Sequence, residues 1–411
     1  MRKTLLITLT YIYILCGVFS ANVFAQDTSI IRQFKPTIDT AHEAVPERDL
    51  IDVMHSLRKN KPAKVADTTI QPHKFLYSVV PAVGYTLSSG LTAIISANVA
   101  TYLSDPKTTN ISSVTVSANY TQYNQLTIPV FLTVWTKNNE YNISADWRFY
   151  KYPQDTYGLG GHSSIKNADN IDYYHLRLHQ SVQKRVTNSL YLGLGYFLDY
   201  HWDIDEKGYN KDVAEYGLPV KTFASGPVAT VLFDSRKNSI NPSQGFFANV
   251  VYRPNLTIFG SDNNWQSLTI DVRKYINFPK GSKNVLAFWN LDWLTPSGKP
   301  PYLDLPSTGW DAFNNTGRGY IQGRYRSYNM LYLESEYRFQ VSRNGLFGGV
   351  VFVNTQSFSN GPGLHFDNTT PAFGLGIRIK VNKISKANIA VDYGFGLNGS
   401  RGLFVNLGEI F

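Results

Sequence analysis

Strict two-residue alternation in the C-terminal part of the sequence limits the possible folds more than any other feature. In "FGLGIRIKV", residues 373–381, large apolar residues take every second position and Gly, Arg or Lys take the others, and residues 389–397 repeat the pattern with Ala, Asp or Gly. Side chains of a β-strand point alternately to its two faces. A soluble sandwich would carry Lys, Glu and Thr on its outward face. Glycine and charge share the polar face here, which favours strands between lipid and a wet lumen.

Similar segments recur from residue 74 onward, each about ten residues long, as strands that cross an outer membrane require. With 14% aromatic and 17% charged residues, the composition also favours strands over surface helices. The sequence predicts an all-β fold, a transmembrane antiparallel β-barrel of about sixteen strands over residues 74–411. The strands are expected near residues 74–86, 89–102, 110–121, 125–137, 140–151, 170–183, 187–201, 222–235, 245–255, 265–277, 283–294, 327–340, 345–356, 371–382, 387–397 and 402–411.

The first 25 residues are typical of a secretory signal peptide, with a basic start, an apolar core and a small residue, Ala25, at the expected cleavage site. The only cysteine, Cys16, lies within it, so the exported chain would form no disulfide. No later run of about 18 apolar residues is present, which excludes a helical span. We expect a bacterial outer-membrane barrel in contact with lipid. Residues 26–73 are polar and contain a candidate helix at residues 46–60, so we expect a short periplasmic tail or plug.

Charge and motifs argue against several other classes of protein. The net charge of +9 suits an anionic partner, but export argues against nucleic acid and favours a basic lumen or acidic lipid headgroups. His175 and His179 share a strand face, yet no third ligand is visible, and no metal site is predicted. Residues 394–399 match G-x-G-x-x-G without a following helix, which argues against dinucleotide binding. No catalytic set is found, and we expect no enzymatic activity and no cofactor.

The stretch "NNTGRGYIQGRYRSYN", residues 314–329, interrupts the alternating pattern. It lies in a connection of roughly thirty residues, too long for a turn and typical of a functional or folded-in loop. On the strand that follows, Glu334, Glu336 and Arg338 alternate with apolar residues and should point into the lumen. We expect the loop to fold into the barrel and Arg318 to pair with Glu336, because a buried arginine needs such a partner.

Four motifs in this sequence together resemble the BamA/TamA-type outer-membrane insertases, also called the bacterial surface antigen family. Arg318-Gly319-Tyr320 resembles the family's Val-Arg-Gly-Phe/Tyr loop motif, whose arginine is held by acidic residues on the lumen wall; position 317, Val or Leu in the family, is Gly here. Glu336 matches the wall glutamate, and Asn354 falls where the family has a second acid, Asp. The resemblance therefore implies a clamp that lacks its second charge.

The other two motifs lie on either side of this loop. A hairpin motif, D-x-R...N/P-x-x-G, is matched by Asp234, Arg236, Asn241, Pro242 and Gly245. A C-terminal signal for assembly into the membrane is matched by Asn406, Leu407, Gly408 and Phe411. From this second match we expect Phe411 to face lipid at the end of the closing strand.

The resemblance implies a role in assembling outer-membrane proteins or translocating polypeptides, through an opening between the first and last strands. Its partners would be unfolded outer-membrane proteins or other envelope proteins, and the chain could be one subunit of a larger envelope complex. Family members with these activities carry POTRA domains, for which residues 26–73 leave no room. A non-enzymatic channel or structural scaffold barrel therefore remains the alternative.

Overall fold

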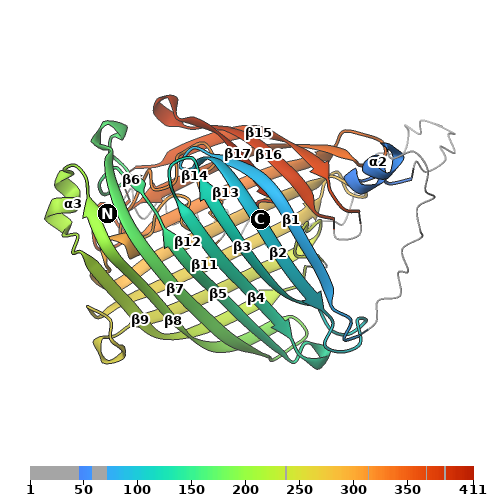
Figure 1. Cartoon of the computed structure of the whole chain (residues 1–411), viewed down its shortest axis with the longest axis horizontal. Coiled ribbons are helices and arrows are strands. Elements are labelled where there is room, and N and C mark those ends of the chain that lie inside the picture. Colours follow the sequence, from blue (N-terminus) through green and yellow to red (C-terminus); the bar gives the residue numbers. More distant parts are fainter. Residues whose placement is uncertain (1–45, 58–71, 237, 313, 367, 384–385) are drawn as a thin grey trace, which may run out of the picture.

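The chain forms one antiparallel sheet that rolls into a barrel, with each long strand paired to the next along the sequence (Figure 1). The computed structural model describes residues 46–57, 72–236, 238–312, 314–366, 368–383 and 386–411. The predicted signal peptide and most of the predicted tail lie outside the described residues. The prediction of an all-β barrel with about sixteen strands is confirmed, because sixteen long strands and one short strand, β6, make up the sheet.

Most strands begin and end within a few residues of their predicted positions, and β10 and β11 coincide with them. The bounds are β1 Leu76–Thr86, β2 Gly90–Thr101, β3 Ser112–Thr121, β4 Leu126–Trp135, β5 Tyr141–Lys151, β6 Gln154–Thr156, β7 Asp169–Arg185, β8 Leu190–Glu206, β9 Lys221–Asp234, β10 Gly245–Asn255, β11 Trp265–Asn277, β12 Val285–Gly298, β13 Met330–Gln340, β14 Phe347–Phe358, β15 Thr370–Lys380, β16 Asn388–Phe395 and β17 Arg401–Leu407.

Three parts of the sheet differ from the prediction. Strands β7 and β8 have 17 residues each and extend beyond the predicted ranges, while the short strand β6, which pairs with β7, was not predicted. Strand β16 ends at Phe395, since a short helical turn at Leu397–Gly399 follows it. Strand β17 ends at Leu407 instead of residue 411, because Gly408 adopts a left-handed conformation, φ 105°, that ends the extended strand.

In the residues that the structure describes, helices are few and short. The α-helices there are α2 Leu50–Leu57, inside the predicted helical range 46–60, and α3 Lys211–Tyr216. Turns of 3-10 helix lie at Lys137–Asn139, Ile165–Asn167, Thr257–Phe259, Tyr302–Asp304 and Leu397–Gly399. Helix α3 begins after Asn210, whose side chain accepts hydrogen bonds from the backbone N–H groups of Asp212 and Val213. No helix in the described ranges is long and apolar enough to cross a membrane.

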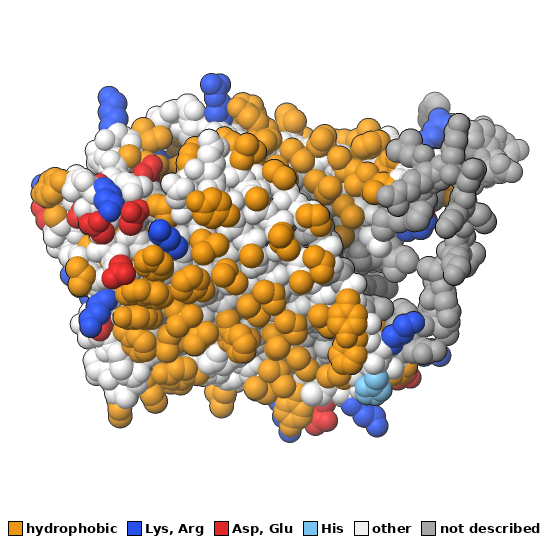
Figure 2. Space-filling model, viewed as in Figure 1, with side chains coloured by type: hydrophobic (Ala, Val, Ile, Leu, Met, Phe, Trp, Pro, Cys, Tyr) orange, Lys and Arg blue, Asp and Glu red, His pale blue; other side chains and the backbone are white. Residues whose placement is uncertain are grey.

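The outer surface of the barrel is apolar, and the alternation of the strands explains why. Along β15, Phe373, Leu375 and Ile377 point outward and are 53 to 62% exposed, whereas Arg378 points into the lumen and is 4% exposed. Figure 2 shows apolar side chains over the side of the barrel and charged side chains near its two ends. This distribution matches a barrel whose outer wall contacts lipid.

The two ends of the barrel differ in their connections. One end, here called the turn end, carries the hairpin turns at residues 186–189, 278–284, 341–346 and 381–387, and β1 begins and β17 ends there. The other, the loop end, carries the connections 152–168, 207–220, 299–329 and 359–369. Helix α2 lies outside the turn end and α3 lies at the loop end (Figure 1). In outer-membrane barrels, short turns lie on the periplasmic side and longer loops on the outer side, and the two ends of this barrel show the same contrast.

The barrel closes where β1 and β17 lie side by side, a junction that we call the seam (Figure 1). Neighbouring strands elsewhere form backbone ladders, including β1 with β2 and β16 with β17. Across the described residues of β1 and β17, no such ladder forms. The two strands therefore keep unpaired backbone edges at the one place where the sheet meets itself.

Candidate functional site

The described residues of the connection between β12 and β13 fold into the lumen, and residues 314–329, for which the sequence predicts this, are among them. The connection forms an irregular hairpin, in which the Thr308 N–H donates to the Tyr325 carbonyl at 3.0 Å and Ser307 pairs with Arg326. Its large side chains are buried against the inner wall, among them Tyr302, Leu305, Trp310, Tyr320, Tyr325 and Tyr328. The loop thus packs inside the lumen, and its tip is at residues 317–320.

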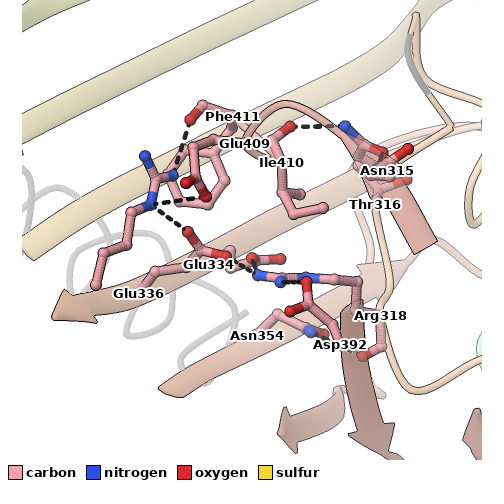
Figure 3. Close-up of polar contacts among 12 residues, drawn as sticks. Asn315, Thr316, Arg318, Glu334, Glu336, Asn354, Asp392, Glu409, Ile410 and Phe411 are labelled. Atoms are coloured by element: carbon pink, nitrogen blue, oxygen red, sulfur yellow. Dashed lines mark hydrogen bonds and ion pairs between the residues drawn. The ribbon is translucent and has the colours of Figure 1, made fainter. Parts of the chain in front are cut away.

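At the tip, the guanidinium of Arg318 binds three carboxylates (Figure 3), and it also lies over one aromatic ring. Its Nη2 donates to both Glu334 and Glu336 of β13, and its Nη1 donates to Asp392 Oδ2 of β16 at 2.5 Å. The Arg318 Cζ lies 3.7 Å from the centroid of the Phe352 ring on β14. Because Arg318 is 1% exposed, these contacts replace its hydration and fix the loop to β13, β14 and β16.

The next two residues of the tip lie against β15, β16 and the turn after it. A Cβ on Gly319, whose φ is 109°, would lie 2.9 Å from the Ala372 Cβ, and a Cβ on Gly394 would lie 2.6 Å from the Gly319 nitrogen. The Tyr320 hydroxyl donates to the Pro371 carbonyl at 2.7 Å. Only glycine at both positions allows the two backbones to approach this closely. Gly394, in the G-x-G-x-x-G stretch, thus leaves the space in which the loop tip packs.

The implied absence of a second charge at the clamp is wrong. Asn354 does lie at the site, but its Nδ2 donates to the backbone carbonyl of Arg318 at 2.9 Å. Glu334 and Asp392 supply the additional negative charges beside Glu336. The departure at Gly317 also has a local reason: its φ is 76°, and a Cβ there would lie 2.5 Å from the Thr308 Cγ2. A valine or leucine at position 317 would be strained in this loop.

Two further arginines extend the cluster toward the turn end. Arg338 donates through Nε to Glu336 Oε2 at 2.7 Å, and Arg378 donates through Nη1 to Asp392 Oδ1 at 2.5 Å. Arg378 also donates through Nε to Glu409 Oε2 at 2.8 Å. The whole set, which we call the arginine cluster, consists of Arg318, Arg338, Arg378, Glu334, Glu336, Asp392 and Glu409. Three cations thus face four carboxylates in a buried network.

The C-terminal residues 408–411 turn into the lumen and contact this cluster, which corrects the expectation that Phe411 faces lipid (Figure 3). Phe411 is 4% exposed, its ring centroid lies 5.2 Å from that of Trp289, and its carbonyl accepts a hydrogen bond from Arg338 Nη2 at 2.8 Å. The turn at Gly408 redirects the chain inward. Asn406 donates to Asn315 at 2.8 Å, so two residues of the C-terminal motif contact the interior rather than the membrane.

The hairpin motif lies elsewhere, at the turn end between β9 and β10. Arg236 forms a two-pronged ion pair with Asp234, at 3.0 and 2.9 Å, and its Cζ lies 4.3 Å from the Phe247 ring centroid. Asn241 donates to the Lys386 carbonyl at 3.2 Å, Pro242 is buried and Gly245 begins β10. These residues therefore connect the turn between β9 and β10 to the turn between β15 and β16, whereas Arg318 pairs with carboxylates of β13 and β16.

His175 and His179 bind a common carboxylate in the lumen. Their Nε2 atoms lie 3.0 and 2.7 Å from the two oxygens of Asp199, which also accepts hydrogen bonds from Arg177 and Arg253. Asp199 is thus already surrounded by positive or donor groups. Over the described part of the chain, no group of three or more His, Cys, Asp or Glu side chains is arranged to hold a metal ion.

The seam lies beside the loop tip, across a cavity of about 330 Å³. The lining of this cavity includes Tyr85 of β1, Phe404 and Asn406 of β17, and Arg318 and Tyr320 of the loop. On β17, a Cβ at Gly402 would lie 2.4 Å from the Leu87 Cδ1, in the turn after β1. The two edges of the seam therefore approach each other closely without a backbone ladder.

Comparisons with known proteins match this geometry at the level of the fold. No family model and no curated protein matches the sequence. BamA from Haemophilus ducreyi lacking POTRA domains 1–3 superposes with a TM-score of 0.54 and 15% identity, over 82% of this chain and 70% of that one. The chain has the barrel fold of BamA and CdiB. CdiB from Acinetobacter baumannii (TM-score 0.54, 13% identity) and from Escherichia coli (0.51, 10%) also match over 82% of this chain.

This chain spans 60% of the length of the A. baumannii CdiB structure and 68% of the E. coli one. The BamA-type fold is that of an outer-membrane barrel, which agrees with the apolar outer wall. At such low identity, the likeness establishes the fold alone. The arginine cluster and the seam are therefore the features of this chain from which its function has to be argued.

Proposed function

We propose that this barrel assembles or translocates polypeptides at the outer membrane by opening its seam to a substrate chain. An exposed strand edge offers a row of unpaired N–H and C=O groups, with which an incoming extended chain pairs as an added strand. The unpaired junction of β1 and β17 is the observation that carries the proposal. No chemical step is involved, and we propose that the function is non-enzymatic.

The composition of the closing strand supports an opening at this place. Strand β17 has seven residues, the fewest among the sixteen long strands, and contains Gly402, which leaves no side chain to pack across the ladder. Its ladder with β16 spans Ile389↔Leu407 to Phe395↔Arg401, whereas β7 and β8 pair over their much longer length. Separation of β17 from β1 disrupts no backbone ladder in the described residues.

The arginine cluster holds together the strands of the wall next to the seam. Arg318 ties the loop to β13 and β16, and Arg378 ties β15 to β16 and to Glu409 beyond β17. Buried ion networks of this kind break only at a large free-energy cost. We infer that this network keeps β13 to β16 together while β17 and β1 separate.

The alternative, a structural scaffold barrel, is favoured by one observation. Side chains of the loop between β12 and β13 and of the C-terminal residues pack against the inner wall and fill part of the lumen. A scaffold would need neither a channel nor a seam that opens. The two functions differ in whether activity depends on movement at the seam, and this difference can be tested.

The test locks the seam with a disulfide between Leu87→Cys and Gly402→Cys, the positions whose side-chain spaces meet. Cys16 lies in the predicted signal peptide, so a mature chain would carry the engineered pair alone. The oxidised and reduced proteins are reconstituted in liposomes and supplied with a urea-unfolded outer-membrane barrel. Folding of that substrate is followed by its heat-modifiable migration in gels. We expect folding to proceed with the reduced protein and to fall to the level of empty liposomes with the oxidised one.

The matched control is Val391→Cys with Val405→Cys, which joins β16 and β17 across their existing ladder. Oxidation of this pair should leave substrate folding unchanged, because it does not cross the seam. If the seam-locked protein folds substrate as fast as its reduced form, opening of the seam is not the mechanism. If even the reduced and unmodified proteins give no more folding than empty liposomes, the scaffold function replaces the proposed one.

A further inference from the structure

The described N-terminal segment, residues 46–57, lies against three hairpin turns at the turn end, and we call it the strap. The Arg48 N–H donates to the Asn344 carbonyl at 3.0 Å, in the turn between β13 and β14. The Asp52 carboxylate binds Lys383 Nζ at 2.8 Å, in the turn between β15 and β16. Glu47 lies 3.3 Å from Lys283 Nζ and 3.5 Å from Lys380 Nζ. The strap thus contacts segments that are more than 200 residues away in the sequence.

Asp49 both starts the helix of the strap and attaches it to the barrel. Its Oδ1 accepts a hydrogen bond from the Asp52 N–H at 2.8 Å, and the Asp49 N–H donates to Asp52 Oδ2 at 3.2 Å, which together cap the first turn of α2. The other oxygen, Oδ2, accepts a hydrogen bond from the Lys383 N–H at 2.9 Å. Asp49 is 3% exposed. Helix formation and docking therefore depend on the same side chain.

The strap is held in a way that allows release. Its ion pairs are partly exposed, with Glu47 46% and Lys283 71% accessible, and surface pairs of this kind contribute little to stability. Helix α2 has 8 residues, fewer than the roughly 12 that an isolated helix needs in water. The strap therefore folds only where it docks.

The strap also lies at one opening of the lumen. A cavity of about 380 Å³ at the turn end is lined by Glu47 of the strap and by Arg338, Arg378 and Glu409 of the arginine cluster. Lysines surround this opening. Lys283, Lys380 and Lys386 line the cavity, and Lys383 lies beside it under Asp52. We call these four residues the lysine rim.

We propose that the lysine rim is a docking surface for an acidic helix of a periplasmic partner protein, which the strap occupies in the isolated chain and yields to that partner. The strap itself shows the chemistry that fits: the carboxylates of Glu47 and Asp52 pair with lysine amines on two turns and on β15, and the Asp49 carboxylate accepts the backbone N–H of Lys383. A partner helix with carboxylates at similar spacing makes the same contacts. The lumen opening is therefore covered by the strap or by the partner, and it is uncovered while the two exchange.

The test uses the full chain in detergent and a fluorescent peptide with the sequence of residues 46–57, whose binding is followed by anisotropy. The strap-weakened variant Asp49→Asn/Asp52→Asn keeps the rim intact but removes two of its contacts. If the unmodified strap is docked about nine-tenths of the time, the peptide should bind this variant about tenfold more tightly than the unmodified chain. The rim variant Lys380→Gln/Lys383→Gln should lose peptide binding.

Two controls separate docking from nonspecific attraction and from misfolding. A peptide with Glu47→Gln, Asp49→Asn and Asp52→Asn should not bind any form of the protein, and each variant should keep the heat-modifiable migration of a folded barrel. Equal peptide affinity for the unmodified and strap-weakened chains overturns the proposal, since it shows that the strap does not occupy the binding surface. Absence of binding to the strap-weakened chain, or binding that survives in the rim variant, overturns it as well.

Discussion

Arg318 and Asp392 lie 74 positions apart in the sequence and meet inside the barrel, with 2.5 Å between Nη1 and Oδ2. Asp392 is 0% exposed and also accepts a hydrogen bond from Arg378. Through this one carboxylate, the tip of the lumen loop is joined to β16, the strand that pairs with the closing strand β17. The loop therefore stabilises the part of the sheet directly behind the seam.

The charge arrangement around Arg318 predicts an order of stabilities. Arg318→Ala leaves Glu334, Glu336 and Asp392 without their shared cation, and loss of one partner in a buried pair costs about 3–5 kcal/mol. Glu336→Gln should cost less, because Glu334 and Asp392 still bind Arg318. The measurement is the temperature at which the purified barrel loses its heat-modifiable band. A larger loss for Glu336→Gln than for Arg318→Ala would contradict the shared clamp.

Arg324 provides a matched control in the same loop. It is also buried, but its guanidinium donates to the Oγ and the carbonyl of Ser163, which are neutral groups. Arg324→Ala removes no charge partner of a buried carboxylate in these contacts. Its melting temperature should therefore fall less than that of Arg318→Ala.

A second prediction concerns the space at the loop tip. Gly319→Ala adds a methyl group within 2.9 Å of the Ala372 Cβ, and overpacking of this kind costs about 1–3 kcal/mol in addition to the backbone strain. Gly363→Ala is the control, because Gly363 has a similar φ, 98°, but open space around its Cβ. Both variants carry the strain of a left-handed residue. We expect Gly319→Ala to lower the melting temperature more, and equal effects would mean that the close approach does not matter.

Sequence alone predicts the barrel and one contact of the cluster, and the reason is geometric. The alternation of side chains on β13 places Glu336 in the lumen, and the arginine-rich loop directly precedes that strand. The pairing of Arg318 with Glu336 can therefore be predicted, because the two residues are close in the sequence. Asp392 lies on the polar face of a predicted strand, but nothing local indicates that β16 stands opposite the loop tip. That relation depends on the closure of the barrel and on the path of the loop through it.

Phe411 illustrates a different limit of the alternating pattern. Continued alternation from β17 would place it on the lipid side, but Gly408 turns the chain inward and Arg338 and Trp289 receive it. A single glycine with a positive φ changes the face of every residue that follows. Glycine at that position permits this turn without requiring it, which is why the sequence pattern did not reveal the turn.

The inward position of Phe411 can be tested by photocrosslinking. A benzoylphenylalanine at position 411 should crosslink within the chain, because the ring lies among Trp289 and Tyr275 in the lumen. The same probe at Phe373, which is 62% exposed on the outer wall, should crosslink to lipid in reconstituted membranes. Mass spectrometry distinguishes the two products. Predominant lipid adducts at position 411 would restore the outward orientation that the sequence pattern suggests.

The last prediction is that the strap leaves the barrel when Glu47 and Asp52 are protonated. The hydrogen bond with Lys383 lowers the pKa of Asp52. For Glu47, partial burial raises the pKa, but the positive charges of Lys380 and Lys283 outweigh burial, and the pKa of Glu47 lies below its ordinary value. A carboxyl group whose pKa is lower when the strap is docked favours docking at pH values above its free pKa. That contribution disappears as the pH falls below about 4.

A nitroxide on Met54→Cys should therefore show restricted motion at pH 7 and fast motion below about pH 4. It should also move fast in 1 M salt, where the Debye length is about threefold shorter than at 0.1 M. In the Asp49→Asn/Asp52→Asn background, the label should already be mobile at pH 7. A spectrum that stays restricted down to pH 3 would mean that contacts other than these ion pairs hold the strap.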